Sequence, residues 1–354
     1  MKILQLIDTL NPGGAEKMAL NYWKALKDRS VSSVLLVTRE KGLWGEEIHD
    51  TPDFYFLKKR NTLDLKALWR LKKIIKKYEI GIVHAHGTSW FFAVLCKLSG
   101  SNFKLIWHDH YGNSEFLQNR PLKALKFFSG YIDGIISVNN ALKHWAKEKL
   151  NFKKEIIFLP NFVTEEKTGI IKYLKGESDF KLITVANLRP QKDHLNLLKA
   201  FDLLQKEFPV SLHLFGRDYC DAYSERLKLE FDKRKEVYYY GEVSNVIPYL
   251  RDADIGVLSS ESEGLPLALI EYGMAGLPVV CTDVGECREV VNVNARLVKP
   301  RDPNTLAKAI NFYLLNPEEM KNDSKALQKG INELYSEEAV LEKYLNFVSK
   351  IEKR

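Results

Sequence analysis

The feature that most restricts the fold of this chain is an alternation of short apolar runs with helix-like segments, which occurs twice. The first series includes "KILQLIDTL", "SSVLLVT", "GIVHAH" and "GIISVN"; the second includes "KLITVA", "SLHLFG", "IGVLSS" and "PVVCTD". Such runs between helical patterns are typical of βαβ units, whose strands form parallel sheets. The sequence therefore predicts an α/β fold with two sheets.

A polar stretch, "VTEEKTGIIKYLKGESD", separates the two series. The chain of 354 residues is also long enough for two domains of ordinary size. We therefore expect an N-terminal Rossmann-like domain over residues 1–165 and a second one over residues 172–334. The tail, residues 335–354, has the apolar spacing of an amphipathic helix.

Two motifs follow predicted strands, where open α/β sheets bind their ligands. Gly13 and Gly14 come after the first strand and open a helix, so their backbone can approach an anion closely. A tight strand-to-helix turn explains this pair equally well. Arg189 and Lys192 enter a helix after the first strand of the second series, which suits a diphosphate, although surface charge is the simpler explanation.

The most informative stretch is "SESEGLPLALIEYGMAGLPVV", which begins at Ser260. It places Glu263 in a Gly/Pro-marked loop and Glu271 inside a predicted helix, where Pro266 suits the first turn. Ordinary capping is one interpretation, because negative charge is favourable near a helix N-terminus. The other is a ligand site, in which sugar or phosphate oxygens meet the backbone N–H groups around Gly264, Leu265 and Leu267.

The glutamate pair and its surroundings resemble the signature of the retaining glycosyltransferases of family 4. Matches in the same order along the chain are "GGAEK", "LPNFV", "VANLRPQKD", "LHLFGRD" and "RLVKPRDPNTLAKAI". The resemblance covers nearly the whole chain and is more specific in the second half. It implies the GT-B fold, in which two Rossmann-like domains face a central cleft and the C-terminal helix crosses back to the first domain.

The resemblance also implies roles for individual residues. Glu263 would contact the hydroxyls of a donor sugar, and Glu271 would hold the ribose of its nucleotide. Arg189 and Lys192 would neutralise the diphosphate, near the glycine loop. The backbone around Phe215, Gly216 and Val243 would line the base pocket.

Two histidine-bearing strand ends, "IVHAHG" and "IWHDHYG", permit two interpretations. Four histidines at two strand ends suggest a metal site, but no cysteine or carboxylate-rich partner accompanies them, and we expect no metal there. The resemblance implies that such loops face the acceptor and the donor sugar. We therefore assign His86 and Asp109 to the catalytic set, with Glu263, Arg189 and Lys192, and expect His84 and His108 to pack in the interior.

The family needs no metal ion for turnover, and we expect neither a metal nor a cofactor, the donor being a substrate. The letters "DAD" at residues 252–254 follow a predicted helix and precede a strand, so we interpret them as a turn. The sequence departs from the family pattern at "LFGRDY", which lacks the second glycine usual there, and at Ala295, where a glycine is usual. The first departure puts the contacts to the base in doubt.

Charge is concentrated in the first half of the chain. Residues 1–170 contain 27 Lys and Arg against 17 Asp and Glu, a balance of +10, and the remainder carries −3, which together give +7. Much of this charge lies in "LKKRNTLDLKALWRLKKIIKKYE", where apolar and cationic residues alternate at helical spacing. This helix is either solvated or binds an anionic membrane surface. We expect no nucleic acid partner, since no binding motif accompanies the charge.

The sequence also predicts where the protein works. It has no apolar run long enough to span a membrane, and its first residues lack the pattern of a signal peptide. Cys96, Cys220, Cys281 and Cys287 show no CxxC pair and no metal-ligand spacing, so we expect free thiols in a reducing cytoplasm. Attachment to the inner face of the cytoplasmic membrane is left open.

These observations favour a metal-independent, retaining glycosyltransferase. It would move a sugar from a nucleotide-diphosphate sugar, UDP-linked before GDP-linked, to a glycan or lipid-linked acceptor of a bacterial surface polysaccharide. One alternative is a nucleotide-sugar epimerase of similar fold, which would need a dedicated acid/base pair. The other is a non-catalytic sugar-nucleotide-binding protein, against which the combination of two glutamates with Arg189 and Lys192 argues.

Overall fold

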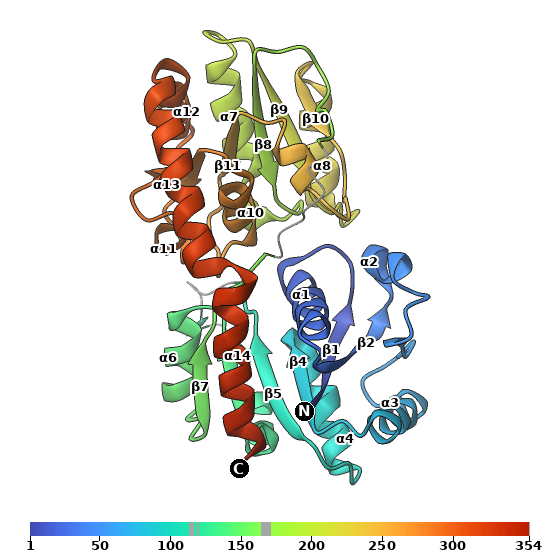
Figure 1. Cartoon of the computed structure of the whole chain (residues 1–354). Coiled ribbons are helices and arrows are strands. Elements are labelled where there is room, and N and C mark those ends of the chain that lie inside the picture. Colours follow the sequence, from blue (N-terminus) through green and yellow to red (C-terminus); the bar gives the residue numbers. More distant parts are fainter. Residues whose placement is uncertain (113–116, 119, 164–170, 354) are drawn as a thin grey trace. The chain divides into compact units, whose positions relative to one another are not determined.

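The structure is a computed structural model that describes residues 1–112, 117–118, 120–163 and 171–353. The chain divides into two compact units, Met1–Thr164 with Glu337–Arg354, and Glu165–Ser336. Each unit is built around one parallel β-sheet with helices on both faces (Figure 1). The predicted α/β fold with two sheets is therefore confirmed. The four cysteines are free thiols, as predicted.

The sheet of the first unit has the strand order β3-β2-β1-β4-β5-β6-β7 in its described residues. The strands are β1 (Lys2–Thr9), β2 (Ser32–Glu40), β3 (Phe54–Phe56), β4 (Ile82–His86), β5 (Lys104–Asp109), β6 (Gly134–Ser137) and β7 (Glu155–Phe158). The parallel register sets Gln5 of β1 beside His84 of β4, and His86 of β4 beside His108 of β5. Because side chains alternate across a strand, these four residues share one face of the sheet.

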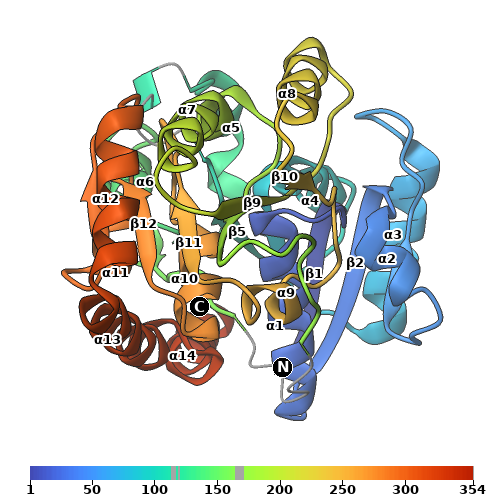
Figure 2. The same cartoon turned by 90° about the horizontal axis from the view of Figure 1, so that it is seen from above.

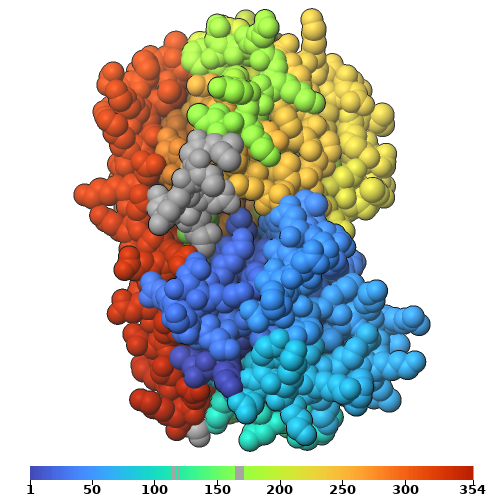
Figure 3. Space-filling view, turned by 45° about the vertical axis from the view of Figure 1, so that its right-hand side comes forward, coloured from blue at the N-terminus to red at the C-terminus, as the bar shows by residue number. Residues whose placement is uncertain are grey.

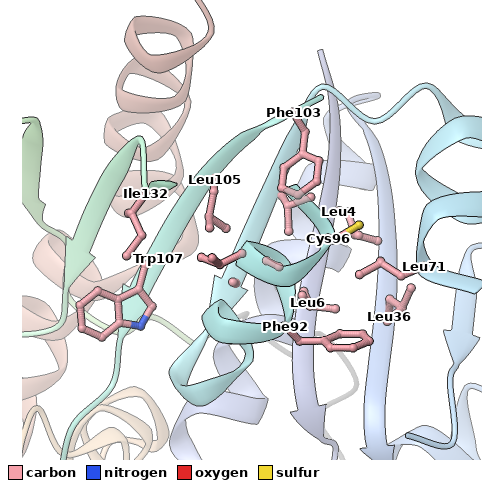
Figure 4. Close-up of a cluster of buried hydrophobic side chains, with 14 of the residues drawn as sticks. Leu4, Leu6, Leu36, Leu71, Phe92, Cys96, Phe103, Leu105, Trp107 and Ile132 are labelled. Atoms are coloured by element: carbon pink, nitrogen blue, oxygen red, sulfur yellow. The ribbon is translucent and has the colours of Figure 1, made fainter. Parts of the chain in front are cut away.

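Hydrophobic clusters cover both faces of this sheet. On the face that carries the histidines, α1 (Gly14–Asp28) and α14 (Glu337–Glu352) pack through residues such as Tyr22 and Tyr344. On the other face lie α3 (Leu65–Tyr78), α4 (Trp90–Leu98), α5 (Lys123–Phe128) and α6 (Asn140–Glu148). Figure 4 shows this second cluster, in which Leu71 and Phe92 lie near Leu36. The short helices are α2 (Gly42–Glu47), η1 (Gly87–Ser89) and η3 (Ser129–Tyr131).

The sheet of the second unit has the order β10-β9-β8-β11-β12-β13. Its strands are β8 (Phe180–Val185), β9 (Val210–Phe215), β10 (Val237–Tyr239), β11 (Ile255–Leu258), β12 (Val279–Thr282) and β13 (Arg296–Val298). Its helices are η4 (Pro190–Lys192), α7 (His194–Leu204), α8 (Ala222–Asp232), α9 (Ile247–Leu250), α10 (Leu267–Ala275), α11 (Cys287–Val291), α12 (Pro303–Leu315) and α13 (Pro317–Tyr335). Figure 2 shows α7 and α12 on one side of this sheet and α10 and α13 on the other.

The C-terminal helix α14 belongs to the first unit although the sequence places it after the second. Its apolar stripe is buried against the first sheet: Val340, Leu341, Tyr344, Phe347, Val348 and Ile351. At about 25 cal/mol per Å², burying six such side chains is a large stabilising contribution, which explains why the chain returns. None of the helices in the described part of the chain has the length and apolar character needed to span a membrane.

Candidate active site

A buried carboxylate lies at the centre of the predicted donor site. Glu263 is 6% exposed in the loop between β11 and α10. Its Oε1 atom accepts hydrogen bonds from Ser260 Oγ and from Lys192 Nζ, both at 2.6 Å. Burying a carboxylate is unfavourable unless it is paired, and these two donors provide the pairing. The structure therefore brings together two of the predicted catalytic residues, Lys192 and Glu263.

This meeting depends on the strand order, because β8 and β11 are neighbours in the sheet and their following loops are hydrogen-bonded together. Ser259 Oγ donates to the carbonyls of Lys192 and Asp193 at 3.1 and 3.2 Å. The backbone N–H of Glu261 donates to the carbonyl of Gln191 at 2.8 Å. The two loops consequently form one rigid support for Lys192 and Glu263.

A third loop, after β12, clamps the Glu263 loop from the other side. Thr282 Oγ1 donates a hydrogen bond to the carbonyl of Ser260 at 2.7 Å. The backbone N–H of Glu286 donates to the carbonyl of Gly264 at 3.0 Å. Gly285 has φ +53°, and a Cβ atom there would lie 2.2 Å from the carbonyl oxygen of Glu263. Only glycine fits such a position.

We predict that Gly285→Ala impairs activity more than stability. The added methyl group must push the backbone at Glu263, and a displacement of about 1 Å at a catalytic group can cost roughly 10²-fold in rate. Steady-state assays and thermal melts of the variant check this. Gly112→Ala is the matched control, because a Cβ there meets no atom within 4 Å; equal loss of rate in both variants would contradict the prediction.

Arg189 is positioned by an aromatic side chain from the neighbouring β9–α8 loop. Its guanidinium lies over the Tyr219 ring, with Cζ 4.5 Å from the ring centroid, and it donates a hydrogen bond to the Tyr219 hydroxyl. Arg217 lies over the same ring at 5.2 Å. Tyr219 belongs to the "LFGRDY" segment, which lacks the second glycine of the family pattern. Its side chain contacts the guanidinium of Arg189.

The region predicted to line a base pocket is aromatic and tightly packed. Phe215 is buried and stacks on Tyr240 with ring centroids 4.4 Å apart. The Gly216 N–H donates to the carbonyl of Gly241 at 2.9 Å, which joins the ends of β9 and β10. Val243 is half-buried in the segment that follows. The contact of Phe215, Gly216 and Val243 with a base stays a prediction.

The second glutamate lies in α10, as predicted. Glu271 is 7% exposed in the second turn of this helix. Pro266 is the N-cap residue, one position before the predicted first turn, and no side chain caps the helix. Gly264, Leu265 and Leu267 accordingly surround an N-terminus whose N–H groups carry partial positive charge. The "DAD" letters form a turn, as predicted, in which Asp252 pairs with Lys181 at 2.9 Å.

The glycine loop of the first unit forms the predicted strand-to-helix turn. Gly13 is the N-cap of α1 and Gly14 its first residue, with no side-chain cap. A Cβ at Gly14 would meet nothing within 4 Å, so open space surrounds this position. Its role towards phosphates stays a prediction.

His86 and Asp109 are buried and make hydrogen bonds inside the first unit. The ring nitrogens of His86 lie 2.8 Å from Gln5 Oε1 and 3.2 Å from His110 Nε2. Asp109 accepts two hydrogen bonds from the Arg120 guanidinium, both at 2.7 Å. This ion pair holds both carboxylate oxygens, so contact of Asp109 with a substrate stays a prediction.

The histidines form a buried array on the face covered by α1 and α14. His84 and His108 are fully buried, as expected, and their rings lie 3.2 Å apart at Nε2 and Nδ1. The Tyr344 hydroxyl of α14 lies 3.1 Å from His84 Nδ1. Burial holds the pKa values of His84, His86 and His108 well below their usual value and lowers that of His110 to about 3.

The array has the residue types of a metal site. One ring nitrogen each of His84, His86 and His108 can be chosen so that the three lie within 4.8 Å of one another. However, the nitrogens of His84 and His86 are engaged in hydrogen bonds with neighbouring side chains. Among the described residues the array therefore fits a network of neutral imidazoles, and we assign it no ion.

Comparison with known proteins agrees with this geometry. Residues 12–167 match the family described as Glycosyltransferase Family 4, and residues 165–332 match Glycosyl transferases group 1. The chain belongs to the family 4 glycosyltransferases. This glycosyltransferase is 27% identical over 295 residues to the O-antigen biosynthesis glycosyltransferase WbnH of Escherichia coli, covering 81% of this chain and 82% of that protein.

One further relative and two solved structures resemble this chain. The capsular polysaccharide biosynthesis glycosyltransferase CapH of Staphylococcus aureus is 26% identical over 314 residues, covering 82% of this chain and 83% of that protein. The structure of Anabaena Alr3699/HepE in complex with UDP and glucose has a TM-score of 0.80 at 16% identity, covering 99% and 100% of the two chains. A glycosyltransferase from Rickettsia africae has a TM-score of 0.78 at 18% identity, covering 99% and 98%. These structures confirm the predicted GT-B fold.

Three residues of the candidate site could not be singled out from the sequence. Ser260 and Gly285 support Glu263, and Tyr219 orients Arg189. A serine three residues before the glutamate was visible, but nothing in its spacing showed that it donates to the carboxylate. For Tyr219 the available signal is its place in "LFGRDY", where the sequence departs from the family pattern.

Proposed function

We propose that this glycosyltransferase moves a sugar from a nucleoside-diphosphate sugar, with retention of anomeric configuration, to a glycan or lipid-linked acceptor in the synthesis of a bacterial surface polysaccharide. UDP is the preferred carrier and GDP the next. The observation that carries the proposal is the pair of Glu263 and Lys192 just before the N-terminus of α10, with Arg189 held by Tyr219 three residues before Lys192. One carboxylate for sugar hydroxyls and two cations for a diphosphate match this class of donor.

The relatives support the finer parts of the proposal by what their names say. WbnH and CapH are named for O-antigen and capsular polysaccharide biosynthesis. Alr3699/HepE has been captured with UDP and with UDP-glucose. These descriptions concern those proteins, and we carry the substrate classes to this chain as part of the proposal.

In the proposed reaction the bond between the anomeric carbon and the diphosphate breaks through an oxocarbenium-like transition state. Arg189, Lys192 and the N–H groups of α10 stabilise the negative charge that develops on the departing diphosphate. The acceptor hydroxyl attacks the same face of the sugar, and its proton passes to the departing phosphate oxygen. A new glycosidic bond, a nucleoside diphosphate and retention of configuration result.

A panel of nucleotide sugars tests the proposal. Release of nucleoside diphosphate together with a glycosylated acceptor supports transfer, whereas an epimerised sugar nucleotide indicates an epimerase. Binding without turnover indicates a binding protein. Lys192→Ala should abolish most of the transfer, and Lys199→Ala is the matched control, because this lysine is exposed on the following helix α7.

We predict that transfer survives excess EDTA. If Arg189 and Lys192 take the place of a divalent cation at the diphosphate, chelation removes nothing that the reaction needs. Initial rates with and without EDTA, and after adding Mg²⁺ or Mn²⁺, check this. Loss of the rate to EDTA with recovery on adding either ion would refute the arrangement.

The proposal includes a location. A lipid-linked acceptor is held in a membrane, so the enzyme would work at the inner face of the cytoplasmic membrane and bind its anionic surface through the basic first unit. The charge of +10 over residues 1–170 is the observation that favours this.

A further inference from the structure

The helix α3 exposes large apolar side chains on its solvent side. Leu65 is 76% exposed and Trp69 57% exposed, and Leu63, just before the helix, is 67% exposed. The opposite side of α3 is buried in the cluster of Figure 4 through Ala67, Leu71, Ile74 and Ile75. The core therefore does not need the exposed residues. In Figure 3 the light-blue α3 segment lies on the outer surface of the first unit.

The same helix carries six cationic side chains and no acidic one. Lys66, Lys73 and Lys76 are exposed. The two acidic residues at its ends are engaged: Asp64 caps the helix by accepting from the Ala67 N–H, and Glu79 pairs with Lys2. The positive charge of the exposed side is accordingly not neutralised within the helix.

The structure separates these cations into two groups. Lys72 donates to the carbonyl of Ser99 at 2.6 Å, and Lys77 donates to the Tyr55 hydroxyl at 3.0 Å. Lys73 instead lies over the exposed Trp69 ring, 3.7 Å from its centroid. Leu65, Lys66, Trp69, Lys73 and Lys76 therefore make up one mixed apolar and cationic surface, which we call the α3 face.

We infer that the α3 face is the surface by which this protein binds an anionic lipid bilayer. Leu65 and Trp69 enter the region between headgroups and acyl chains, where tryptophan side chains are favoured. Lys66, Lys73 and Lys76 remain at the anionic headgroups and are attracted to them. The α3 face would thus be the membrane contact of the proposed function. This role rests on that function, because a lipid-linked acceptor is the reason for the enzyme to bind a membrane.

Two features favour lipid over other anionic partners. A nucleic acid backbone would attract the lysines but offers no acyl region for Leu65, and no nucleic acid motif accompanies the helix. A helix that is merely solvated explains the charges but not three large apolar side chains exposed within seven residues.

The test uses the full-length protein and sedimentation with phosphatidylcholine vesicles that contain rising fractions of phosphatidylglycerol. One variant replaces Leu65 and Trp69 with serine; the other replaces Lys66, Lys73 and Lys76 with glutamine. The matched controls are Tyr173→Ser and the triple glutamine variant of Lys321, Lys325 and Lys329, all exposed residues of the second unit. Circular dichroism and thermal melts verify that every variant is folded.

Wild type should bind more tightly as the anionic fraction rises and more weakly as salt is added. The triple glutamine variant of the α3 face should bind about 100-fold more weakly, and the double serine variant should also lose affinity. Both controls should bind like wild type. Unchanged binding of either α3 variant, equal losses in the controls, or equally tight binding to duplex DNA would overturn the inference.

Release of nucleoside diphosphate, measured with a water-soluble acceptor analogue, separates this inference from the proposed function. The α3 variants should retain that activity, since they change none of the residues proposed to bind the donor. Vesicle binding without any turnover would refute the proposed function, and turnover without vesicle binding would refute the docking surface.

Discussion

Replacing Glu263 with glutamine should lower sugar transfer by roughly 10²-fold while the affinity for the nucleoside diphosphate stays unchanged or becomes tighter. The nucleoside diphosphate lacks the transferred sugar, whose hydroxyls Glu263 would hold. The substitution also removes the carboxylate that pairs with Lys192 at 2.6 Å. Lys192 is then more available to the diphosphate, so its affinity for the protein should rise. The spacing of the two glutamates in the sequence does not predict this increase.

The same substitution at Glu271 should have the opposite profile. If this residue holds the ribose, both donor and product lose a charged hydrogen bond, which costs about 1.5–3 kcal/mol and weakens binding of the diphosphate by roughly 10- to 150-fold. Because Gln keeps the volume of this buried side chain, packing in α10 should change little.

Calorimetry with the nucleoside diphosphate and a transfer assay on both variants decide between the two roles. Equal loss of product affinity at the two positions would show that the division of labour is wrong and that Glu263 is structural. Glu261→Gln is the control, since this neighbouring carboxylate pairs with Arg301 instead of Lys192.

The first unit should lose much of its stability as the pH falls from 7 to 5. Burial holds the pKa values of His84, His86 and His108 well below 6.5 and lowers that of His110 to about 3. In the unfolded chain each would titrate near 6.5. Below that pH the unfolded state binds more protons than the native state, so the free energy of unfolding falls as the pH falls.

The expected size of this effect is large. Each histidine that stays neutral in the native state removes about 2 kcal/mol of stability between pH 7 and pH 5, so the four together remove about 8 kcal/mol. That is comparable with the whole stability of an ordinary domain. The stability is fully present above pH 6.5 and is lost progressively towards the low native pKa values.

Thermal and urea denaturation at a series of pH values measure the slope. His110→Gln should reduce the number of protons taken up on unfolding by about one, because it removes one of the four groups. His144→Gln, which replaces a histidine exposed on α6, is the matched control variant. A melting temperature that stays constant between pH 7 and pH 5 would show that the array is protonated or hydrated in the native protein.

Several conclusions could be drawn from local sequence alone. The alternation of apolar runs and helical patterns predicted two parallel sheets, because strand and helix periods are properties of short segments. The same reasoning placed Glu263 in a loop and Glu271 in a helix, and it predicted the turn at residues 252–254 and the terminal amphipathic helix. The family resemblance then implied the chemical roles of individual residues, which periodicity cannot predict.

Other features depend on which strands become neighbours, and local periodicity contains no information about that. Lys192 and Glu263 are 71 residues apart, and they meet because β8 pairs with β11. Tyr344 reaches His84 across 260 residues because α14 packs on the first sheet. Burial in this packing then lowers the pKa values of the histidines. The buried Asp109 pairs with Arg120. The sequence thus determined the elements and the residue types, and tertiary packing decided which side chains meet, which are dehydrated and which remain exposed, as on α3.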